Sequence, residues 1–177
     1  MDKVSIYVIH GERIDEVIVG MVGKDSFIQY IKKLNDIEFT SDVSVTEAIL
    51  ASSNIGMGDG YSVLISDFLT DEDYEGAIDK LVERKRDLLC VQVLSREELN
   101  PQFRGKMHLF DSENPQEYFR KKIDKDRANA YKAALKFVTE KIKNYCESRG
   151  GNYLLVPSDA KLADVLFGGL VDLGVLK

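Results

Sequence analysis

Asp67 is the residue whose type and position best suit ligand chemistry. It follows the apolar segment Tyr61–Ser66, which has the composition of a strand covered on both faces. Ligands of open parallel sheets bind beyond the carboxyl ends of the strands, and a carboxylate there can hold a hard cation such as Mg²⁺ through its oxygens. The alternative is that Asp67 caps a turn or the following helix, and the sequence leaves both interpretations open.

The other chemically suggestive groups have simpler structural explanations. The acidic run Asp71–Asp73 suits the first turn of a helix, where the helix dipole stabilises carboxylates. The glycine-rich segment Gly56–Gly60 precedes a strand, whereas a phosphate loop follows a strand and opens a helix. His10 and His108 lack a metal-ligand spacing, and no Gly-x-Ser-x-Gly elbow supports a Ser-His-Asp arrangement.

Composition and charge favour an intracellular protein. Cys90 and Cys146 lie in apolar segments, so we expect buried free thiols in a reducing compartment and not a disulfide framework. The net charge of −6 argues against non-specific binding to nucleic acid. The basic cluster Glu83–Arg86 closes a predicted helix and complements its dipole. With no apolar run of about 18 residues and no signal peptide at the N-terminus, we expect a cytoplasmic protein without a membrane span.

Hydrophobic periodicity predicts the elements that position these groups. Strands are predicted at Val4–Ile9, Glu16–Val22, Tyr61–Ser66, Leu88–Leu94, Lys106–Phe110, Glu117–Lys122 and Tyr153–Val156. Helices are predicted from Asp25 or Ser26 to Leu34, from Ser44 to Ser52, from Thr70 or Asp71 to Leu81, from Lys125 to Arg149, and from Leu162 to Leu173. The first two strands read as a hairpin, and so do the fifth and sixth.

The order of these elements predicts an α/β fold. Strand, helix and strand over residues 61–94 form a βαβ unit, which requires parallel strands joined by a crossover. We therefore expect a three-layer, Rossmann-like architecture, with a mostly parallel sheet flanked by helices and an extra β-hairpin. The length of 177 residues suits a single domain spanning residues 1–177.

A series of segments resembles a known family. In order along the chain they are YSVLISDFL at Tyr61–Leu69, LCVQVLSREEL at Leu89–Leu99, LFDSE at Leu109–Glu113, and NYLLVPSD at Asn152–Asp159. The series resembles the C-terminal part of a bacterial family with a von Willebrand factor A-like domain, the one numbered fifty-eight among domains of unknown function. Before Tyr61 the likeness is looser, resting on Asp2–Val4 and Val45–Ile49.

The resemblance implies a divalent-ion site at the top of the sheet. In such domains an Asp-x-Ser-x-Ser loop follows the first strand, a Thr lies in a later loop, and an Asp follows the fourth strand. Asp67 matches this last position; the Thr position falls near Val43, so Ser44 or Thr46 would have to supply the hydroxyl. Asp67 and Ser44 are thus the metal candidates, and Mg²⁺ or Mn²⁺ the ion to test. The Asp-x-Ser-x-Ser loop is absent, which argues against a complete site, and we expect that the central N-terminal strand of the family is missing.

For function, the resemblance implies a non-catalytic protein-interaction module that serves a MoxR-type AAA+ ATPase. The contacts would come from rim loops that contain Asp42, Phe68, Asp71 and Phe103. The strand edge left open by the missing strand would also suit a homodimer.

Two other classes stay open. A Mg²⁺-dependent phosphatase or nuclease would use Asp67 with Asp71 or Asp73, although such chemistry needs several preorganised carboxylates. A structural fragment without a ligand is the third reading. Phosphoester hydrolysis that is lost in Asp67→Ala would favour the enzyme, and capture of an ATPase would favour the module.

Overall fold

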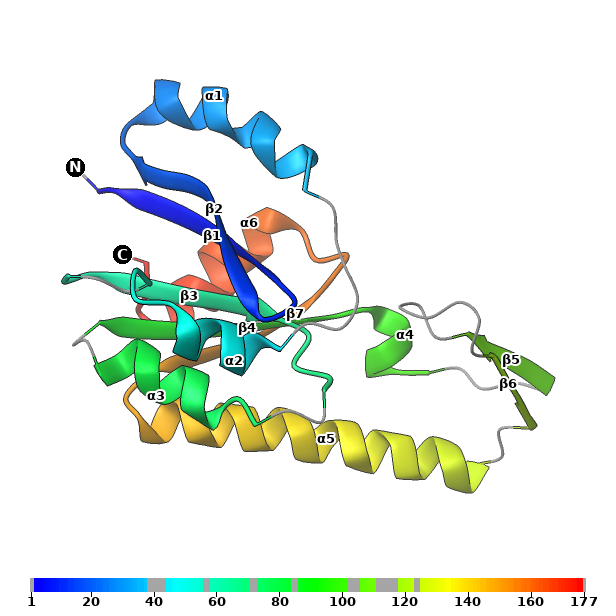
Figure 1. Cartoon of the computed structure of the whole chain (residues 1–177). Coiled ribbons are helices and arrows are strands. Elements are labelled where there is room, and N and C mark those ends of the chain that lie inside the picture. The colour runs from blue at the N-terminus through cyan, green and yellow to red at the C-terminus, as the bar shows by residue number, and fades with distance from the viewer. Residues whose placement is uncertain are drawn as a thin grey trace. The chain divides into compact units, whose positions relative to one another are not determined.

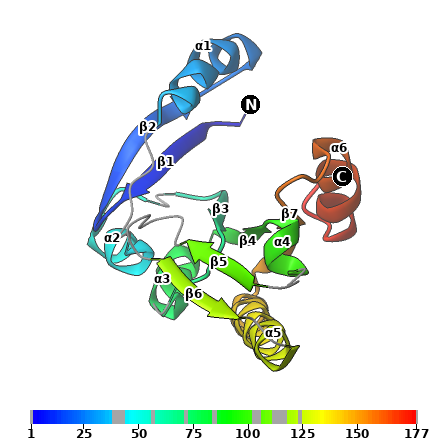
Figure 2. The ribbon, with the colours of Figure 1, turned by 90° about the vertical axis from the view of Figure 1, so that its right-hand side faces the viewer.

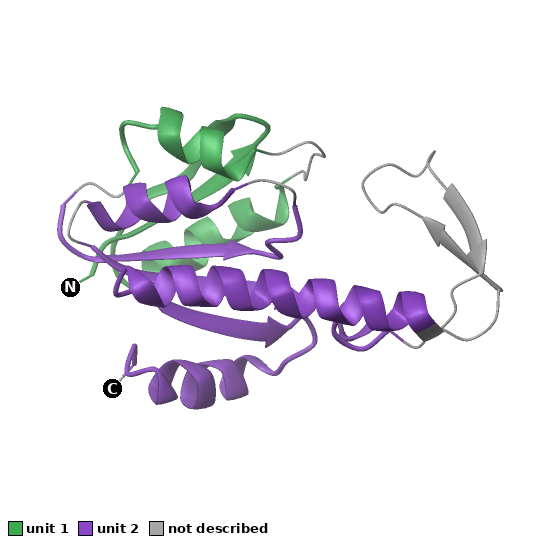
Figure 3. Ribbon diagram, turned by 90° about the horizontal axis from the view of Figure 1, so that it is seen from below, with its two compact units in different colours: residues 1–55 green, residues 56–177 purple. Residues whose placement is uncertain are grey.

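The computed structural model divides the chain into two compact units, residues 1–55 and residues 56–177 (Figure 3). The structure describes residues 2–37, 44–55, 58–70, 73–83, 86–101, 106–110, 118–122 and 125–176. Each unit has its own core. The expectation of a single domain over residues 1–177 stays a prediction.

Unit 1 is a β-hairpin followed by two helices. Strands β1 (Val4–His10) and β2 (Arg13–Met21) pair antiparallel, as the sequence predicts. Gly11 turns the chain between them with a φ of 57°, a left-handed conformation that costs glycine little. Helices α1 (Lys24–Asn35) and α2 (Val45–Ala51) follow. The buried apolar side chains of the unit are Ile18, Met21, Ala48 and Ile49.

The two helices of unit 1 begin in different ways. Helix α2 starts beside Ser44, as predicted, and Ser44 caps it: its Oγ accepts a hydrogen bond from the Glu47 N–H at 3.4 Å. Its own N–H donates to the Gly11 carbonyl at 3.1 Å, which fixes the start of α2 on the hairpin turn. The predicted cap of α1 at Asp25 or Ser26 is wrong, because that helix begins at Lys24 after Gly23 and has no side-chain cap. Asp25 instead lies in the first turn, where a carboxylate suits the helix dipole.

Unit 2 is built on a parallel sheet of three strands, β3 (Tyr61–Ser66), β4 (Asp87–Leu94) and β7 (Asn152–Pro157), in the order β3-β4-β7 (Figure 1). Its helices are α3 (Glu75–Glu83), α4 (Arg96–Leu99), α5 (Lys125–Ser148) and α6 (Leu162–Asp164), with the π-helical turn η1 (Val165–Leu170) after α6. Strands β5 (Lys106–Phe110) and β6 (Tyr118–Lys122) pair antiparallel. The prediction of an α/β fold, with parallel strands flanked by helices and an antiparallel hairpin, is confirmed.

Helices lie on both sides of this sheet (Figures 1 and 2). Helices α3 and α5 lie together on one side of it, and α6 with η1 lies on the other. Helix α5 contacts β4 and β7, and η1 contacts β7. At the latter contact a Cβ on Gly169 would come within 2.9 Å of Leu154 Cδ1, so the absence of a side chain lets the helix approach the strand.

Strand β3 departs from the prediction that both of its faces are covered. Leu64 is buried, but Val63 and Ile65, which point to the opposite face, are 53% and 66% exposed. The reason is the position of β3 at one edge of the three-stranded sheet. On the face to which Val63 and Ile65 point, the helical turn η1 contacts β7, which is the strand at the opposite edge. The core is instead centred on β4, where Leu88, Cys90, Gln92 and Leu94 are all buried.

Candidate site at the carboxyl end of the parallel sheet

The chain leaves β3 through two interlocked side-chain turns. Ser66 Oγ accepts a hydrogen bond from the Phe68 N–H at 3.0 Å. Asp67 Oδ1 accepts one from the Leu69 N–H, also at 3.0 Å. Short polar side chains make such turns by bonding the backbone two residues on. This geometry supports the reading in which Asp67 caps a turn, with one carboxylate oxygen engaged by the backbone.

Phe68 has the strained backbone of this turn. Its φ of 55° is the only positive value among the described non-glycine residues, and residues in such conformations cost about 1–3 kcal/mol. The ring is 1% exposed and meets Tyr74 edge to face, with ring centroids 4.7 Å apart. Phe68, expected on the interaction rim, therefore anchors the turn in the core. Leu69, which is 39% exposed, is the apolar side chain that this turn presents to solvent.

A buried amide on β4 bonds to β7 and to the residue that follows β3. Gln92 of β4 is fully buried; its Nε2 donates to the Asp67 carbonyl at 2.6 Å, and its Oε1 accepts from the Tyr153 hydroxyl of β7. Burial raises the pKa of Tyr153 to about 12, so the phenol stays protonated and able to donate. Sequence reasoning missed Gln92. The available signal was a single amide inside the apolar run LLCVQVL.

The polar residues after β4 and β7 also have structural partners. Ser95 caps α4 in a capping box: its Oγ accepts from the Glu98 N–H at 3.1 Å, and Glu98 Oε2 accepts from the Ser95 N–H at 2.6 Å. Arg96, beside this cap, forms an ion pair of 2.5 Å with Asp159, which follows β7. Both partners are more than half exposed, so this pair contributes little stability.

At the other end of the sheet, Arg86 holds the loop that leads into β3. Its guanidinium donates to the Gly58 carbonyl at 2.9 Å and to the Tyr61 carbonyl at 2.6 Å, and its Nε donates to Ser62 Oγ at 2.9 Å. The sequence analysis predicted that Arg86 lies at the end of a helix and complements the helix dipole. That reading of Arg86 is wrong, because α3 ends at Glu83 and the guanidinium binds loop carbonyls.

The remaining predicted site residues lie in different parts of the chain. Ser44 belongs to unit 1 and Asp67 to unit 2, and Ser44 Oγ caps a helix. Asp42, Asp71 and Phe103 lie outside the described residues. Within the described ranges, no three His, Cys, Asp or Glu side chains are grouped so as to hold a metal ion.

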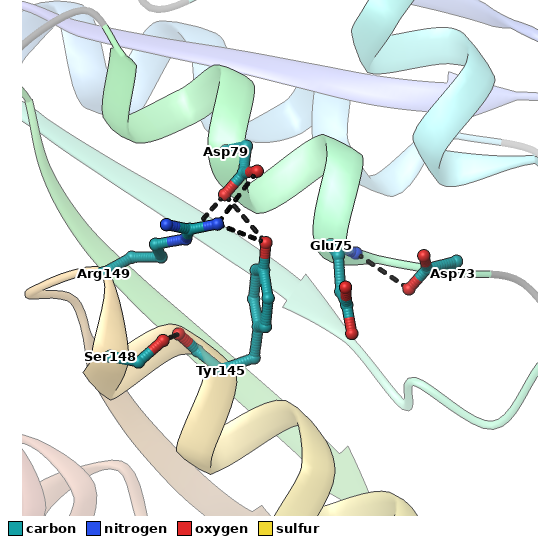
Figure 4. Close-up of polar contacts among 6 residues, drawn as sticks. All are labelled: Asp73, Glu75, Asp79, Tyr145, Ser148 and Arg149. Carbon is teal, nitrogen blue, oxygen red and sulfur yellow. Dashed lines mark hydrogen bonds and ion pairs between the residues drawn. The ribbon is translucent and has the colours of Figure 1, made fainter.

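A second polar cluster, between α3 and α5, was not found by sequence reasoning (Figure 4). Arg149 Nε lies 2.8 Å from Asp79 Oδ1, and Arg149 also donates to Tyr145 Oη at 2.8 Å. The Tyr145 hydroxyl donates to Asp79 Oδ1 at 3.0 Å. The hydrogen bond with Tyr145, together with the charge of Asp79, raises the pKa of Arg149. Tyr145 on α5 and Arg149 directly after it thus bind the same carboxylate on α3, so the cluster links the two helices.

Acidic residues at the start of α3 have partners on α5 as well. Asp73 Oδ1 accepts from the Glu75 N–H at 3.3 Å, and Lys141 Nζ lies 3.5 Å from Asp73 and 3.6 Å from Glu75. Sequence reasoning assigned Asp73 to the first turn of a helix that starts at Thr70 or Asp71. The helix starts later, at Glu75, and Asp73 lies just before it.

Two further observations bear on the kind of protein. In the described part of the chain, no helix combines the length and the apolar character needed to cross a membrane. No family model, no curated protein and no solved structure matches the chain, so the likeness to von Willebrand factor A-like domains stays a resemblance.

Proposed function

We propose that this chain is a non-catalytic protein-interaction module of von Willebrand factor A-like type, with a MoxR-type AAA+ ATPase as its partner. The observation that carries the proposal is the pair of exposed, β-branched side chains Val63 and Ile65 on β3, called here the β3 strip. The choice of an ATPase as partner comes from the family resemblance described above.

The β3 strip has two properties of a protein contact. Within the described residues, β3 is hydrogen-bonded to β4 on one side only, and an edge strand presents backbone N–H and C=O groups that another chain can pair with. Its side chains also supply apolar area: full burial of a Val or Ile side chain contributes about 1.5–3 kcal/mol. The strand carries no charged residue or proline, which are common guards of a sheet edge.

Asp67 supports a structural role more than a catalytic one. One carboxylate oxygen accepts the Leu69 N–H, and the Asp67 carbonyl accepts the buried amide of Gln92. Both bonds hold the exit of β3 in one conformation. A Mg²⁺-dependent phosphatase or nuclease would need this carboxylate aimed at a metal ion together with other ligands.

Binding to a purified MoxR-type ATPase from the same organism tests the proposal. We expect Ile65→Lys to weaken the complex at least tenfold, about 1.4 kcal/mol, because a charge replaces a buried contact. Phe137→Lys is the matched control: Phe137 is 69% exposed on α5, so the same exchange removes apolar area elsewhere. Equal binding by wild type and Ile65→Lys, or no complex with the wild type, would reject the proposal.

Sedimentation of the chain alone and thermal melts separate the alternatives. Self-association that Ile65→Lys abolishes would assign the β3 strip to a homodimer. A rise in Tm with Mg²⁺ or Mn²⁺ that is absent in Asp67→Ala would favour a metal site, since a ligand at about 100 times its Kd adds about 2.7 kcal/mol. The interaction module predicts no such rise.

A further inference from the structure

Strand β3 exposes both a face and an edge. Side chains along a strand point alternately to its two faces. Leu64, on one face, is buried, whereas Val63 and Ile65, on the other, are 53% and 66% exposed. Within the described residues, no strand lies beside the edge of β3 that points away from β4. Another molecule can therefore contact the β3 strip and the backbone of the same strand together.

Both ends of β3 are held by side chains of unit 2. At the amino end Arg86 donates to the Tyr61 carbonyl at 2.6 Å, and at the carboxyl end Gln92 donates to the Asp67 carbonyl, also at 2.6 Å. A strand fixed in this way has little conformational freedom to lose when a second strand pairs with it, and such preorganisation favours binding. The edge is thus suited to the addition of an extended strand.

The two ends of β3 differ in charge. Residues 67–75, which follow the strand, include five carboxylates and no lysine or arginine. Lys141 of α5 pairs with two of them. Asp67 is exposed, and among the described residues no cation lies within ion-pair distance of it. At the amino end a cation, Arg86, is already present. This asymmetry favours a partner strand with a lysine or arginine at the end that lies beside Asp67.

A second copy of the chain suits this edge less well. In a parallel pair of β3 strands, the two Asp67 carboxylates would lie at the same end and repel one another. In an antiparallel pair, Asp67 would lie near the amino end of the other β3. There Arg86 already donates to the carbonyls of Gly58, Asp59 and Tyr61 and to a serine hydroxyl, so few donors are left for a further carboxylate.

We propose that an extended segment of the partner adds to β3 as a further strand of the sheet, with apolar side chains on Val63 and Ile65 and a lysine or arginine beside Asp67. This inference rests on the proposed function, since it describes how the β3 strip binds its partner. Main-chain hydrogen bonds along the edge supply affinity, and alternate side chains supply selectivity. The partner segment has apolar residues at alternate positions, no proline among them, and a cation at one end.

Selection of short peptides from a random library on the whole chain tests this chemistry. We expect the enriched peptides to alternate apolar with polar residues and to have lysine or arginine at one end. Asp67→Asn keeps an oxygen that can accept the Leu69 N–H, and it should weaken such a peptide about two- to fivefold, as for the loss of an exposed ion pair. Asp59→Asn, at the amino end, is the matched control and should not. Enriched peptides without this pattern, or equal losses in the two variants, would overturn the proposal.

Backbone methylation of an enriched peptide tests whether it binds as a strand. The N–H groups of successive residues in a strand point to opposite edges, so only every second one can donate to β3. N-methylation at those positions should lower affinity for the wild-type chain about tenfold, and methylation at the intervening positions should have little effect. Equal effects at all positions, or none at any, would indicate another binding mode and refute strand addition.

Competition with the purified MoxR-type ATPase separates this inference from the proposed function. We expect the enriched peptide to displace the ATPase from the chain. An ATPase complex that Ile65→Lys disrupts, with no alternation in the methylated peptides, would refute strand addition and leave the proposed function in place. Alternation without an ATPase complex would reject the ATPase and support strand addition. A dimer in sedimentation that the peptide does not dissociate would assign the edge to a second copy and overturn the inference.

Discussion

Gln92 places an amide at a position of β4 whose neighbours Cys90 and Leu94 on the same face are buried and non-polar. A buried amide is tolerated only when its donors and acceptors are paired. Here Nε2 donates to the Asp67 carbonyl and Oε1 accepts from the Tyr153 hydroxyl, so one side chain connects β4 with β7 and with the turn after β3. The strained turn at Phe68 follows directly after the Asp67 carbonyl, and we infer that Gln92 helps to hold that turn in place.

Replacement of Gln92 by leucine should therefore lower the free energy of unfolding, although it makes the buried side chain less polar. Gln92→Leu leaves the buried Tyr153 hydroxyl and the part-buried Asp67 carbonyl without these bonds, and an unpaired buried polar group costs about 1–3 kcal/mol. We expect the free energy of unfolding in urea to fall by about 2 kcal/mol or more. The double variant Gln92→Leu/Tyr153→Phe should lose less than the sum of the two single losses. Strict additivity would contradict a direct Gln92–Tyr153 bond.

Tyr153 should also make the stability depend on alkaline pH. Burial raises its pKa from 10.0 to about 12, so the folded state holds the phenol proton more tightly than the unfolded state does. The resulting stabilisation is complete below pH 10 and is lost as the pH rises toward about 12. Urea midpoints measured across this range should fall more steeply for the wild type than for Tyr153→Phe. Parallel curves would show that Tyr153 does not titrate differently in the two states.

At the scale of elements, the sequence predicted which segments form strands better than it predicted which faces of those strands are covered. The strands β3, β4 and β7 lie within a residue or so of their predicted bounds, because continuous apolar runs bounded by polar residues mark strands clearly. The same runs do not tell whether one or two faces are covered, and this is why Val63 and Ile65 were misjudged. Whether a strand lies in the centre or at the edge depends on which strands pair, and hydrophobic pattern alone does not record that.

Helix starts and polar clusters were harder to predict from the sequence, for a related reason. The start of α2 near Ser44 was predicted correctly, and the Ser44 hydroxyl that marks it bonds locally, three residues on. Asp79 and Arg149 are seventy positions apart, and their ion pair exists only once α3 lies beside α5. Arg86 likewise acts on a loop more than twenty positions earlier. The sequence located the start of α2 but misplaced the starts of α1 and α3. Partners brought together by the packing of helices and strands were not predicted.

The close contact of Gly151 with Cys146 gives a test of packing between α5 and the sheet. A Cβ at Gly151 would lie 2.7 Å from Cys146 Sγ and 3.3 Å from the Leu88 carbonyl oxygen. We expect Gly151→Ala to destabilise the chain by about 1–3 kcal/mol, measured by urea unfolding. Adding Cys146→Ala should recover part of that loss, because the shorter side chain vacates the space.

Gly168 provides the control. It lies in η1, where an added Cβ would meet nothing within 4 Å. Because alanine suits a helix better than glycine by about 1 kcal/mol, Gly168→Ala should be neutral or stabilising. A loss for Gly168→Ala as large as for Gly151→Ala would mean that backbone flexibility, and not contact with Cys146, explains both results.

At the scale of the whole molecule, the two units contain elements whose side chains are buried to different extents. Strand β4 is paired on both edges and holds much of the core of unit 2. Helix α1 of unit 1 has no buried residue, and Phe27, Ile28 and Ile31 on it are 40% exposed or more. Regions with few buried contacts open locally at low free energy, whereas central strands open only in global unfolding.

Hydrogen–deuterium exchange should reproduce this difference. Under native conditions we expect the amides of β4 to exchange slowest in the chain, and those of α1 to exchange at least about a hundredfold faster, which corresponds to roughly 2.7 kcal/mol of opening free energy. Mass spectrometry of peptic fragments measures both segments in one experiment. Equal protection of α1 and β4 would indicate that α1 is covered in solution, for example by a partner surface.

The order β3-β4-β7 also has a consequence for how the chain is made. Residues 67–86 join β3 to β4, but residues 95–151 separate β4 from β7. Synthesis proceeds from the N-terminus, and contacts distant in sequence form late because long loops must close first. For the time the ribosome needs to translate residues 95–157, β4 therefore has β3 but not β7 beside it. During that interval its second edge is open to cellular chaperones and to misplaced strands.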